Sequence, residues 1–379
     1  MEVGSCFSSV WTKLKRCFAF LSFMTDEKAL PPVILLSTGA IGDMVIASAL
    51  AAQFYQRDIP HGIVSSGFTL PLWKHFGFAR TYAYCPGNSV PELPSDALVV
   101  DIRNYLRHFP HSSFLPGTER KGHLCEWMAV EALSAVPSLE TLLEKDLFIS
   151  RDDVQIFMTE EEIQAGLAWV VALQQEHGNK PVVILSPYST TTNRNIGKQR
   201  LDEVVYGLQD LVIPCQLMPI PTDGIITGAI LVGSNDLRKV AGLLLAADAY
   251  VGVDSGPLHM VNGVIQGAEW YGHNLKSQRN KGKVFVVTGS SAPEVVAYEG
   301  NTILQAPVRV CDVAPCGAHG YIAPEEYGDR FERKFHPSLR DKGGCVFTGH
   351  HYPDTAPCMT AVPSEQIIEA VRTYLRERI

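Results

Sequence analysis

The stretch that decides the fold is VILLSTGAIGDM, residues 33–44. Its first four residues form a continuous apolar run, which is typical of a strand buried on both faces of a parallel sheet. A turn with two glycines follows, and residues 44–56 then show the pattern of a helix. Strand, glycine turn and helix in this order predict the first unit of a doubly wound α/β sheet.

The same alternation of strands and helices runs through most of the chain. Apolar runs predict further strands at residues 62–65, 97–101, 181–186, 249–253 and 283–287. Periodic patterns predict further helices at residues 159–176, 201–211, 236–247 and 364–378. Since 379 residues exceed what one hydrophobic core usually serves, and the run at 181–186 repeats the first strand, the sequence predicts two Rossmann-like α/β halves.

Domain boundaries follow from this pattern. We expect a basic amphipathic segment at residues 1–28, a first domain at 29–175 and a second at 176–363, with a closing helix at 364–379. The second domain is expected to carry a cysteine-containing insert at residues 308–359.

The composition excludes some classes of protein. Hydrophobic residues make up 46% of the chain and charged residues 19%, which is typical of a globular protein and not of a disordered one. The formal net charge of −8 gives no general attraction to nucleic acid, so a nucleic-acid partner is not favoured.

The nine cysteines and the N-terminal segment bear on location. Without a cleavable signal, nine cysteines in a chain of this length indicate a reducing compartment, and we expect a cytoplasmic protein. Residues 10–24 interleave apolar and basic side chains, and the apolar run within them is too short to span a bilayer. Such a segment can lie on the inner face of a membrane or pack on its own domain.

The first chemical motif is the glycine turn between the first strand and its helix. Two glycines let backbone amides approach a ligand closely, and a helix N-terminus favours an anion. The third glycine of a dinucleotide-binding fingerprint is missing, so a nicotinamide cofactor is a poor inference. An aspartate at this place can cap the helix or do chemistry. The candidate residues are Gly39, Ala40, Ile41, Gly42 and Asp43.

The second motif, GVDSGPLH at residues 252–259, again lies where a strand leads into a helix. Small residues expose backbone donors to phosphate oxygens, and an imidazole can add another donor. An ordinary helix start with an incidental histidine is the alternative. The candidate binding residues are Asp254, Ser255, Gly256, Pro257 and His259.

The third motif follows the first strand of the second half. Hydroxyl side chains and an arginine, namely Ser189, Thr190 and Arg194, are suited to holding a diphosphate. A solvated polar loop would have a similar composition. Open α/β sheets bind their ligands at the carboxyl ends of strands, which favours the binding interpretation.

These motifs resemble those of a known family. AIGDMV, residues 40–45, is similar to the glycine-aspartate motif of the heptosyltransferases, which form glycosyltransferase family nine, and DSGPLH, residues 254–259, is similar to their donor-site signature. Residues 235–248 resemble the helix that leads into that signature. Weaker similarities lie at residues 96–103, 286–293 and 358–371.

The resemblance implies a GT-B fold, in which an N-terminal acceptor domain and a C-terminal donor domain face each other across a cleft. It also implies ADP-heptose as the donor and inversion at the transferred sugar. Asp43 would be the general base. Ser189, Thr190 and Arg194 would bind the donor, with arginine where many relatives carry lysine, and Asp254, Ser255, Gly256 and His259 would hold the diphosphate and sugar.

This chemistry is coherent without the family name. An inverting transfer needs one carboxylate to take the acceptor proton while cationic and hydroxyl groups stabilise the leaving diphosphate. No Asp-x-Asp metal motif is evident in a suitable loop, so we expect no catalytic divalent cation.

A group of cysteines is the main departure from the family pattern. Cys311, Cys316, Cys345 and Cys358 lie in one irregular, glycine-rich stretch. Four thiolates can bind a structural zinc or iron ion, which would order such a segment. Buried free thiols would account for the same residues.

Several functions are compatible with these residues. The acceptor can be a lipopolysaccharide core sugar, a protein hydroxyl or a modified nucleobase, and fold analogy does not choose among them. A nucleotide-sugar epimerase would need a second acid–base group in the cleft. A binding module without catalysis is a further alternative, which the presence of both Asp43 and His259 opposes.

Overall fold

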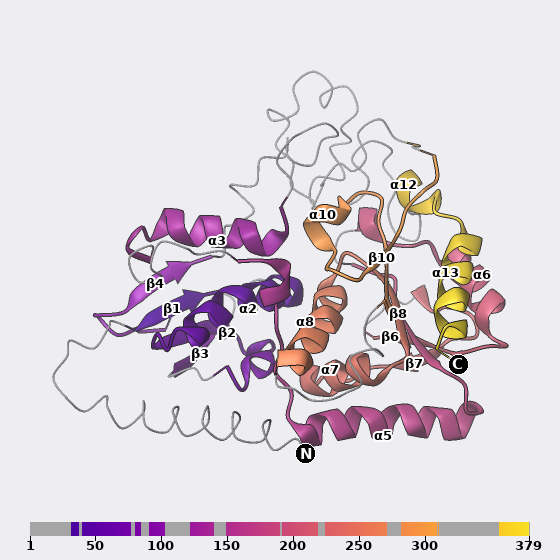
Figure 1. Ribbon diagram of the computed structural model, residues 1–379, viewed down its shortest axis with the longest axis horizontal. Helices are drawn as coiled ribbons and strands as arrows, with labels where there is room; N and C mark the ends of the chain where they lie inside the picture. Colours follow the sequence, from indigo (N-terminus) through magenta and orange to yellow (C-terminus); the bar gives the residue numbers. More distant parts are fainter. Residues whose placement is uncertain are drawn as a thin grey trace, which may run out of the picture.

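The computed structural model describes residues 32–37, 40–76, 80–84, 91–102, 122–139, 149–189, 192–218, 224–270, 282–308, 310 and 356–378. Within them the chain forms two parallel β-sheets with helices packed on them. Figure 1 shows the first sheet on the left, the second on the right and helix α8 between them. The predicted α/β fold class with two Rossmann-like halves is confirmed.

The first sheet has four parallel strands in the order β3-β2-β1-β4. They are β1 (Val33–Leu36), β2 (His61–Ser66), β3 (Arg80–Tyr84) and β4 (Leu98–Asp101). Central strand β1 pairs with both β2 and β4, and its apolar run is fully buried, as its sequence predicts. Helices α2 (Ile41–Gln56) and α3 (Leu124–Ala135) pack together beside this sheet.

The second sheet has six parallel strands in the order β10-β9-β8-β5-β6-β7. They are β5 (Val182–Ser186), β6 (Ile213–Leu217), β7 (Ile230–Val232), β8 (Ala249–Val253), β9 (Val284–Val287) and β10 (Thr302–Leu304). The strand order reverses between β5 and β8, so the connections from these two strands leave toward opposite sides. A reversal of this kind opens a crevice at the carboxyl ends of the strands.

Helices cover both faces of the second sheet. The long ones are α5 (Glu160–His177), α6 (Lys198–Leu208), α7 (Leu237–Ala246), α8 (Gly256–Trp270) and the closing helix α13 (Ser364–Arg376). Short elements connect them: η1 (Leu70–Trp73), η4 (Arg151–Asp153), η5 (Thr192–Arg194), α10 (Pro293–Val296) and α12 (Pro357–Thr360). Helix α13 packs against α6, and these two helices lie together on the right of Figure 1.

Helix α5 leads the chain from the first sheet to the second. It begins with a capping box, in which the Thr159 side chain accepts the N–H of Glu162 and the Glu162 carboxylate accepts the N–H of Thr159. It ends at Gly178, whose φ of 93° lies in the left-handed region that favours glycine. The predicted helix start and end are thereby confirmed. The predicted domain boundary at residue 175 stays a prediction, and α5 packs against α7 of the second half.

Two glycines allow α5 and α7 to cross closely. A methyl group on Gly166 would overlap the backbone of Gly242, and one on Gly242 would lie 2.9 Å from the carbonyl oxygen of Glu162. Beside this crossing the buried Arg238 guanidinium donates to the Glu162 carboxylate and to the carbonyl of Phe157. The crossing ties the linking helix to the second half.

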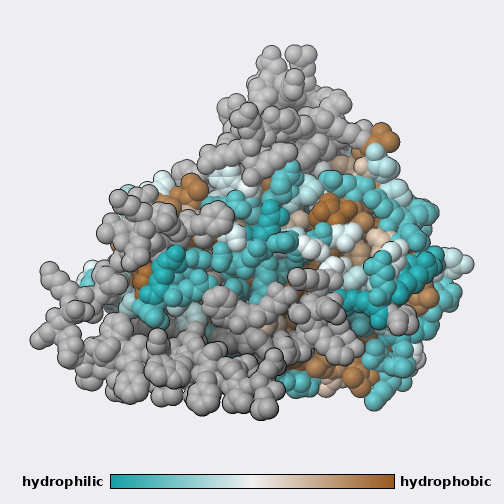
Figure 2. Space-filling view, in the orientation of Figure 1, coloured by the Kyte–Doolittle hydropathy of each residue, from teal (hydrophilic) through white to brown (hydrophobic). Residues whose placement is uncertain are grey.

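The surface view in Figure 2 shows mainly hydrophilic side chains on the described part of this face, with a few apolar areas. Among the described residues, no helix is long and apolar enough to cross a membrane. The predicted amphipathic segment at residues 1–28 lies outside them.

The helix crossing generates a stability prediction. Gly166→Ala should lower the free energy of unfolding by about 1–3 kcal/mol, because backbone has to move to admit the methyl group. Gly67→Ala is the matched control, since a methyl group there meets no atom within 4 Å. Urea denaturation measures both, and an equal effect of the two substitutions would show that the crossing is not tightly packed.

Candidate functional site

The first predicted motif lies where β1 leads into α2. Asp43 is the third residue of the helix, and its Oδ2 accepts the backbone N–H of Ala40 at 3.0 Å. Asp43 is therefore not the N-cap residue itself, which is Ala40, but it satisfies one backbone donor at the helix start. Its side chain is half-buried and lines a pocket. Gly39 lies outside the described residues.

The second motif lies where β8 leads into α8, as its sequence predicts. Helix α8 begins at Gly256, so Pro257 falls in the first turn, where a missing N–H costs no helix hydrogen bond. The Asp254 carboxylate just before it is buried, and its Oδ1 lies 3.7 Å from Nε2 of His259. The Ser255 hydroxyl donates to the carbonyl of Val253 at 3.1 Å.

The third motif meets the second at Asp254. Arg194 lies in η5, and its guanidinium is 2.9 Å from Oδ2 of Asp254. The Ser291 hydroxyl donates to the same oxygen at 2.6 Å. Ser189 is held through its backbone N–H, which donates to the Asn195 side chain at 2.7 Å. Thr190 lies outside the described residues.

The N-termini of α2 and α8 meet face to face. A methyl group on Gly256 would lie 2.9 Å from Cβ of Ile41, and one on Gly42 would lie 3.0 Å from Cδ2 of His259. Each glycine therefore allows the other half of the chain to come close. Because a helix N-terminus carries a partial positive charge, two such ends at one place favour an anionic ligand.

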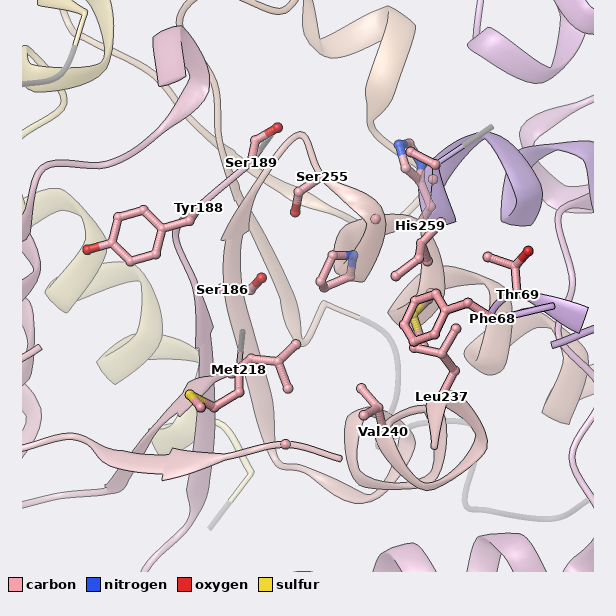
Figure 3. A pocket seen from close by; sticks show the side chains of 18 of the residues that line it. Phe68, Thr69, Ser186, Tyr188, Ser189, Met218, Leu237, Val240, Ser255 and His259 are labelled. Carbon is pink, nitrogen blue, oxygen red and sulfur yellow. The ribbon is translucent and has the colours of Figure 1, made fainter. Parts of the chain in front are cut away.

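A cavity of about 1200 Å³ opens at this meeting point. Every described candidate residue of the three motifs lines it: Ala40, Ile41, Gly42, Asp43, Ser189, Arg194, Asp254, Ser255, Gly256, Pro257 and His259. Figure 3 shows Ser186, Ser189 and Ser255 on the side of the second sheet, with Phe68 and Thr69 entering from the opposite side. The three separate sequence motifs thus share one pocket.

One part of the pocket is apolar. It is lined by Met218, Leu231, Val232, Leu237 and Val240, which come from the β6 and β7 ends and from α7. Met218 and Leu231 are 44% and 43% exposed, and together they form an exposed apolar patch of the kind that lines ligand-binding grooves. Sequence reasoning missed these residues, because apolar residues in strands and helices look like core.

A second group of residues that sequence reasoning did not predict lies behind His259. Nδ1 of His259 is 2.8 Å from the hydroxyl of Tyr298, and the ring of His123 contacts the Tyr298 ring edge-on at 4.6 Å. Burial lowers the pKa of His123 well below its usual value, so that imidazole is neutral at neutral pH. His123 is the N-cap residue of α3 in the first half, and no local sequence signal links it to residue 298.

The predicted metal-binding cysteines fall mostly outside the described residues: Cys311, Cys316 and Cys345. Cys358 is described and lies half-buried in α12, and it does not line the pocket. In the described part of the chain, no group of three or more histidine, cysteine or acidic side chains is placed to hold a metal ion.

Comparison with known proteins supports the fold. No protein-family model and no curated protein sequence matches the chain. Among solved structures, a family 9 glycosyltransferase from Veillonella parvula covers 93% of this chain and 99% of its own, with 12% identity and a TM-score of 0.54.

A second similar structure is the dodecameric iron-containing heptosyltransferase TibC in complex with ADP-D-β-D-heptose. It covers 94% of this chain and 78% of its own, with 14% identity and a TM-score of 0.55. TibC from enterotoxigenic E. coli H10407 matches similarly, with 13% identity over 91% of this chain and 78% of its own and a TM-score of 0.55. These likenesses confirm the predicted GT-B fold of the heptosyltransferases.

The ion pair at the centre of the site generates a prediction. Asp254→Asn should lower the free energy of unfolding by about 3–5 kcal/mol, because it removes the buried carboxylate charge that faces the Arg194 guanidinium, whose side chain is only 13% exposed. Glu369→Gln breaks an exposed ion pair with Arg376 on α13. It should change the free energy of unfolding by no more than about 0.5 kcal/mol. Chemical denaturation of both variants tests this, and similar small losses would mean that solvent screens the Arg194–Asp254 pair.

Proposed function

We propose that this protein is a glycosyltransferase that moves a heptose from ADP-heptose to an acceptor hydroxyl, with inversion and without a catalytic metal ion. The observation that carries the proposal is the shared pocket. Asp43 lines it from the start of α2, while Arg194, Ser255 and His259 line it from the second half. A base on one side and diphosphate-binding groups on the other are what a glycosyl transfer between two substrates needs.

The donor diphosphate would lie at the N-terminus of α8. There the backbone N–H groups of Ser255 and Gly256, the helix dipole and the Arg194 guanidinium all favour negative charge. The Asp254 carboxylate is engaged by Arg194 and Ser291, so we assign it to holding the arginine in place and not to direct contact with phosphate.

The nucleoside would occupy the apolar part of the pocket. A flat purine ring fits a cleft lined by exposed apolar side chains such as Met218, Leu231 and Leu237. TibC, which shares the fold, binds ADP-D-β-D-heptose, and this supports ADP-heptose as the donor here.

Each of these groups has a defined role in the transfer reaction. The acceptor oxygen attacks the anomeric carbon, its proton passes to the Asp43 carboxylate, and the bond between that carbon and the diphosphate breaks. The electron pair leaves with the diphosphate, whose growing charge is stabilised by Arg194 and His259. Attack from the face opposite the leaving group inverts the anomeric configuration.

The acceptor would enter from the side of the first sheet. Ser66, Phe68 and Thr69 line the pocket there, and the Phe68 side chain is 55% exposed. Hydroxyl groups beside an exposed aromatic ring suit a sugar, so we favour a glycan acceptor such as a lipopolysaccharide core sugar over a protein or a nucleobase. We propose a cytoplasmic location, where a basic segment such as residues 1–28 can contact the inner face of the membrane.

The four cysteines are proposed to hold a structural zinc or iron ion. Thiolates are common ligands of both metals, and the similar TibC structure contains iron. Cys358, at α12, would anchor the site to the second half, because a methyl group on Gly289 would lie only 2.8 Å from the Cys358 backbone.

The metal proposal predicts near-stoichiometric zinc or iron in protein purified without added metal, measured by elemental analysis. Cys345→Ser should remove the metal and lower thermal stability more than it lowers turnover per folded molecule, because the ion orders a segment and takes no part in transfer. Cys215→Ser, at a buried thiol of β6, is the control and should keep its metal. Metal-free wild-type protein of full stability would contradict the proposal.

The base assignment predicts that Asp43→Asn lowers kcat by about 10²- to 10⁴-fold, because an amide cannot take the acceptor proton. Stability should stay within about 1 kcal/mol, since the asparagine oxygen can still accept the N–H of Ala40. The control is Asp236→Asn, which alters a helix-capping carboxylate of α7 and should leave turnover unchanged. Sugar transfer by Asp43→Asn at near the wild-type rate would show that the base lies elsewhere.

A further inference from the structure

The ring of His259 has two nitrogens in different surroundings. The Nε2 side faces the pocket region, since Cδ2 lies close to Gly42 and Nε2 is 3.7 Å from Oδ1 of Asp254. The Nδ1 side faces the interior, where the Tyr298 hydroxyl lies 2.8 Å away. Both side chains are buried, so water does not replace this hydrogen bond.

The direction of this hydrogen bond follows from the partners of Tyr298. Within the described part of the chain, His259 is the one hydrogen-bond partner of the Tyr298 hydroxyl. If Nδ1 carried the proton and donated it, the buried hydroxyl hydrogen would have no acceptor, at a cost of about 1–3 kcal/mol. The hydroxyl therefore donates to Nδ1. Burial raises the pKa of Tyr298, which keeps the phenol protonated as a donor.

Tyr298 is itself fixed to the helix that carries His259. Its backbone N–H donates to the side-chain oxygen of Asn301 at 3.0 Å, and the Asn301 amide donates to Asn262 of α8 at 2.8 Å. Asn262 lies one turn after His259 and donates in turn to the carbonyl of Leu258 at 2.9 Å. The loop after α10 is thus tied to α8 at the level of the imidazole.

A residue of the first half, His123, packs against Tyr298 and lies near His259. The His123 ring contacts Tyr298 edge-on at 4.6 Å and lies 6.4 Å from the His259 ring. It is fully buried and neutral, so it adds bulk beside His259 without adding charge. The imidazole of His259 therefore has a fixed plane as well as a fixed hydrogen bond.

We propose that Tyr298 is a positioning residue that keeps the ring proton of His259 on Nε2, so that this nitrogen presents a donor toward the pocket. The hydrogen bond made by one ring nitrogen sets which nitrogen is protonated. The tautomer stands on the geometry alone. Its consequence for donor binding rests on the proposed function, since a donor on Nε2 can hold a diphosphate oxygen and a bare acceptor there would repel it.

The tautomer can be measured directly on the full chain labelled with ¹⁵N-histidine. Long-range ¹H–¹⁵N spectra distinguish protonated from bare ring nitrogens, and His259→Gln identifies the signals among the twelve histidines. We expect a protonated Nε2 and a bare Nδ1 for His259, and a mixture of both tautomers in Tyr298→Phe. A proton on Nδ1 in the wild type, or an unchanged pattern in Tyr298→Phe, would overturn the proposal.

Two further variants separate positioning from folding. Tyr374→Phe, which removes a hydroxyl from α13 far from the pocket, should leave the His259 signals unchanged. Asn301→Ala keeps the Tyr298 hydroxyl but removes the hydrogen bond to the Tyr298 backbone N–H. It should give a smaller fraction of the Nδ1-protonated tautomer of His259 than Tyr298→Phe does. It also supplies the test if Tyr298→Phe does not fold.

Calorimetric titration with ADP tests the consequence. Tyr298→Phe should weaken ADP binding by roughly 2- to 5-fold, because only the fraction of chains whose His259 carries its proton on Nε2 then presents the donor. In a His259→Gln background the same substitution should have no further effect, because Tyr298 acts through the imidazole. If Tyr298→Phe lowered the ADP affinity in the His259→Gln background by the same factor as in the wild type, the proposal would be overturned. If the wild type does not bind ADP, the donor assignment fails and the spectra alone decide the role of Tyr298.

Discussion

The contact between the N-termini of α2 and α8 is the constraint on which the rest of the structure depends. Both helix starts are tightly packed at the contact, since a Cβ atom on Gly256 would lie 2.9 Å from Ile41 and one on Gly42 would lie 3.0 Å from His259. One hydrophobic core continues from the first sheet through both helices to one face of the second sheet. The two sides of the pocket are therefore held at a fixed separation by packed side chains.

This arrangement concentrates positive potential, and the buried acid Asp254 balances it. Two helix N-termini and Arg194 converge on one pocket, which favours a diphosphate. Asp254 places a buried carboxylate 2.9 Å from the Arg194 guanidinium, which offsets part of the cost of taking that charge out of water. The carboxylate lowers the positive potential of the site. In return it fixes the position of the guanidinium, and it lies beside His259.

The sequence predicted the parts of the fold that have local signals. Residues 33–36 and 182–186 are buried on both faces and contain only apolar residues apart from Ser186, and Thr159 with Glu162 marks a helix start. Strand β3, RTYAY, was missed because it carries partly exposed polar side chains, and β7 has only three residues. The motif residues were found through their glycines, but Tyr298 and His123 reach His259 only by tertiary packing.

The measurement that tests the central claim most directly is native mass spectrometry of the full chain with a panel of nucleotide sugars and no acceptor. If the pocket between α2 and α8 binds a nucleotide-diphosphate sugar, one ADP-heptose should bind per chain and ADP should accumulate slowly as water replaces the acceptor. Recovery of every nucleotide sugar unchanged, with no complex detected, would contradict this account of the pocket.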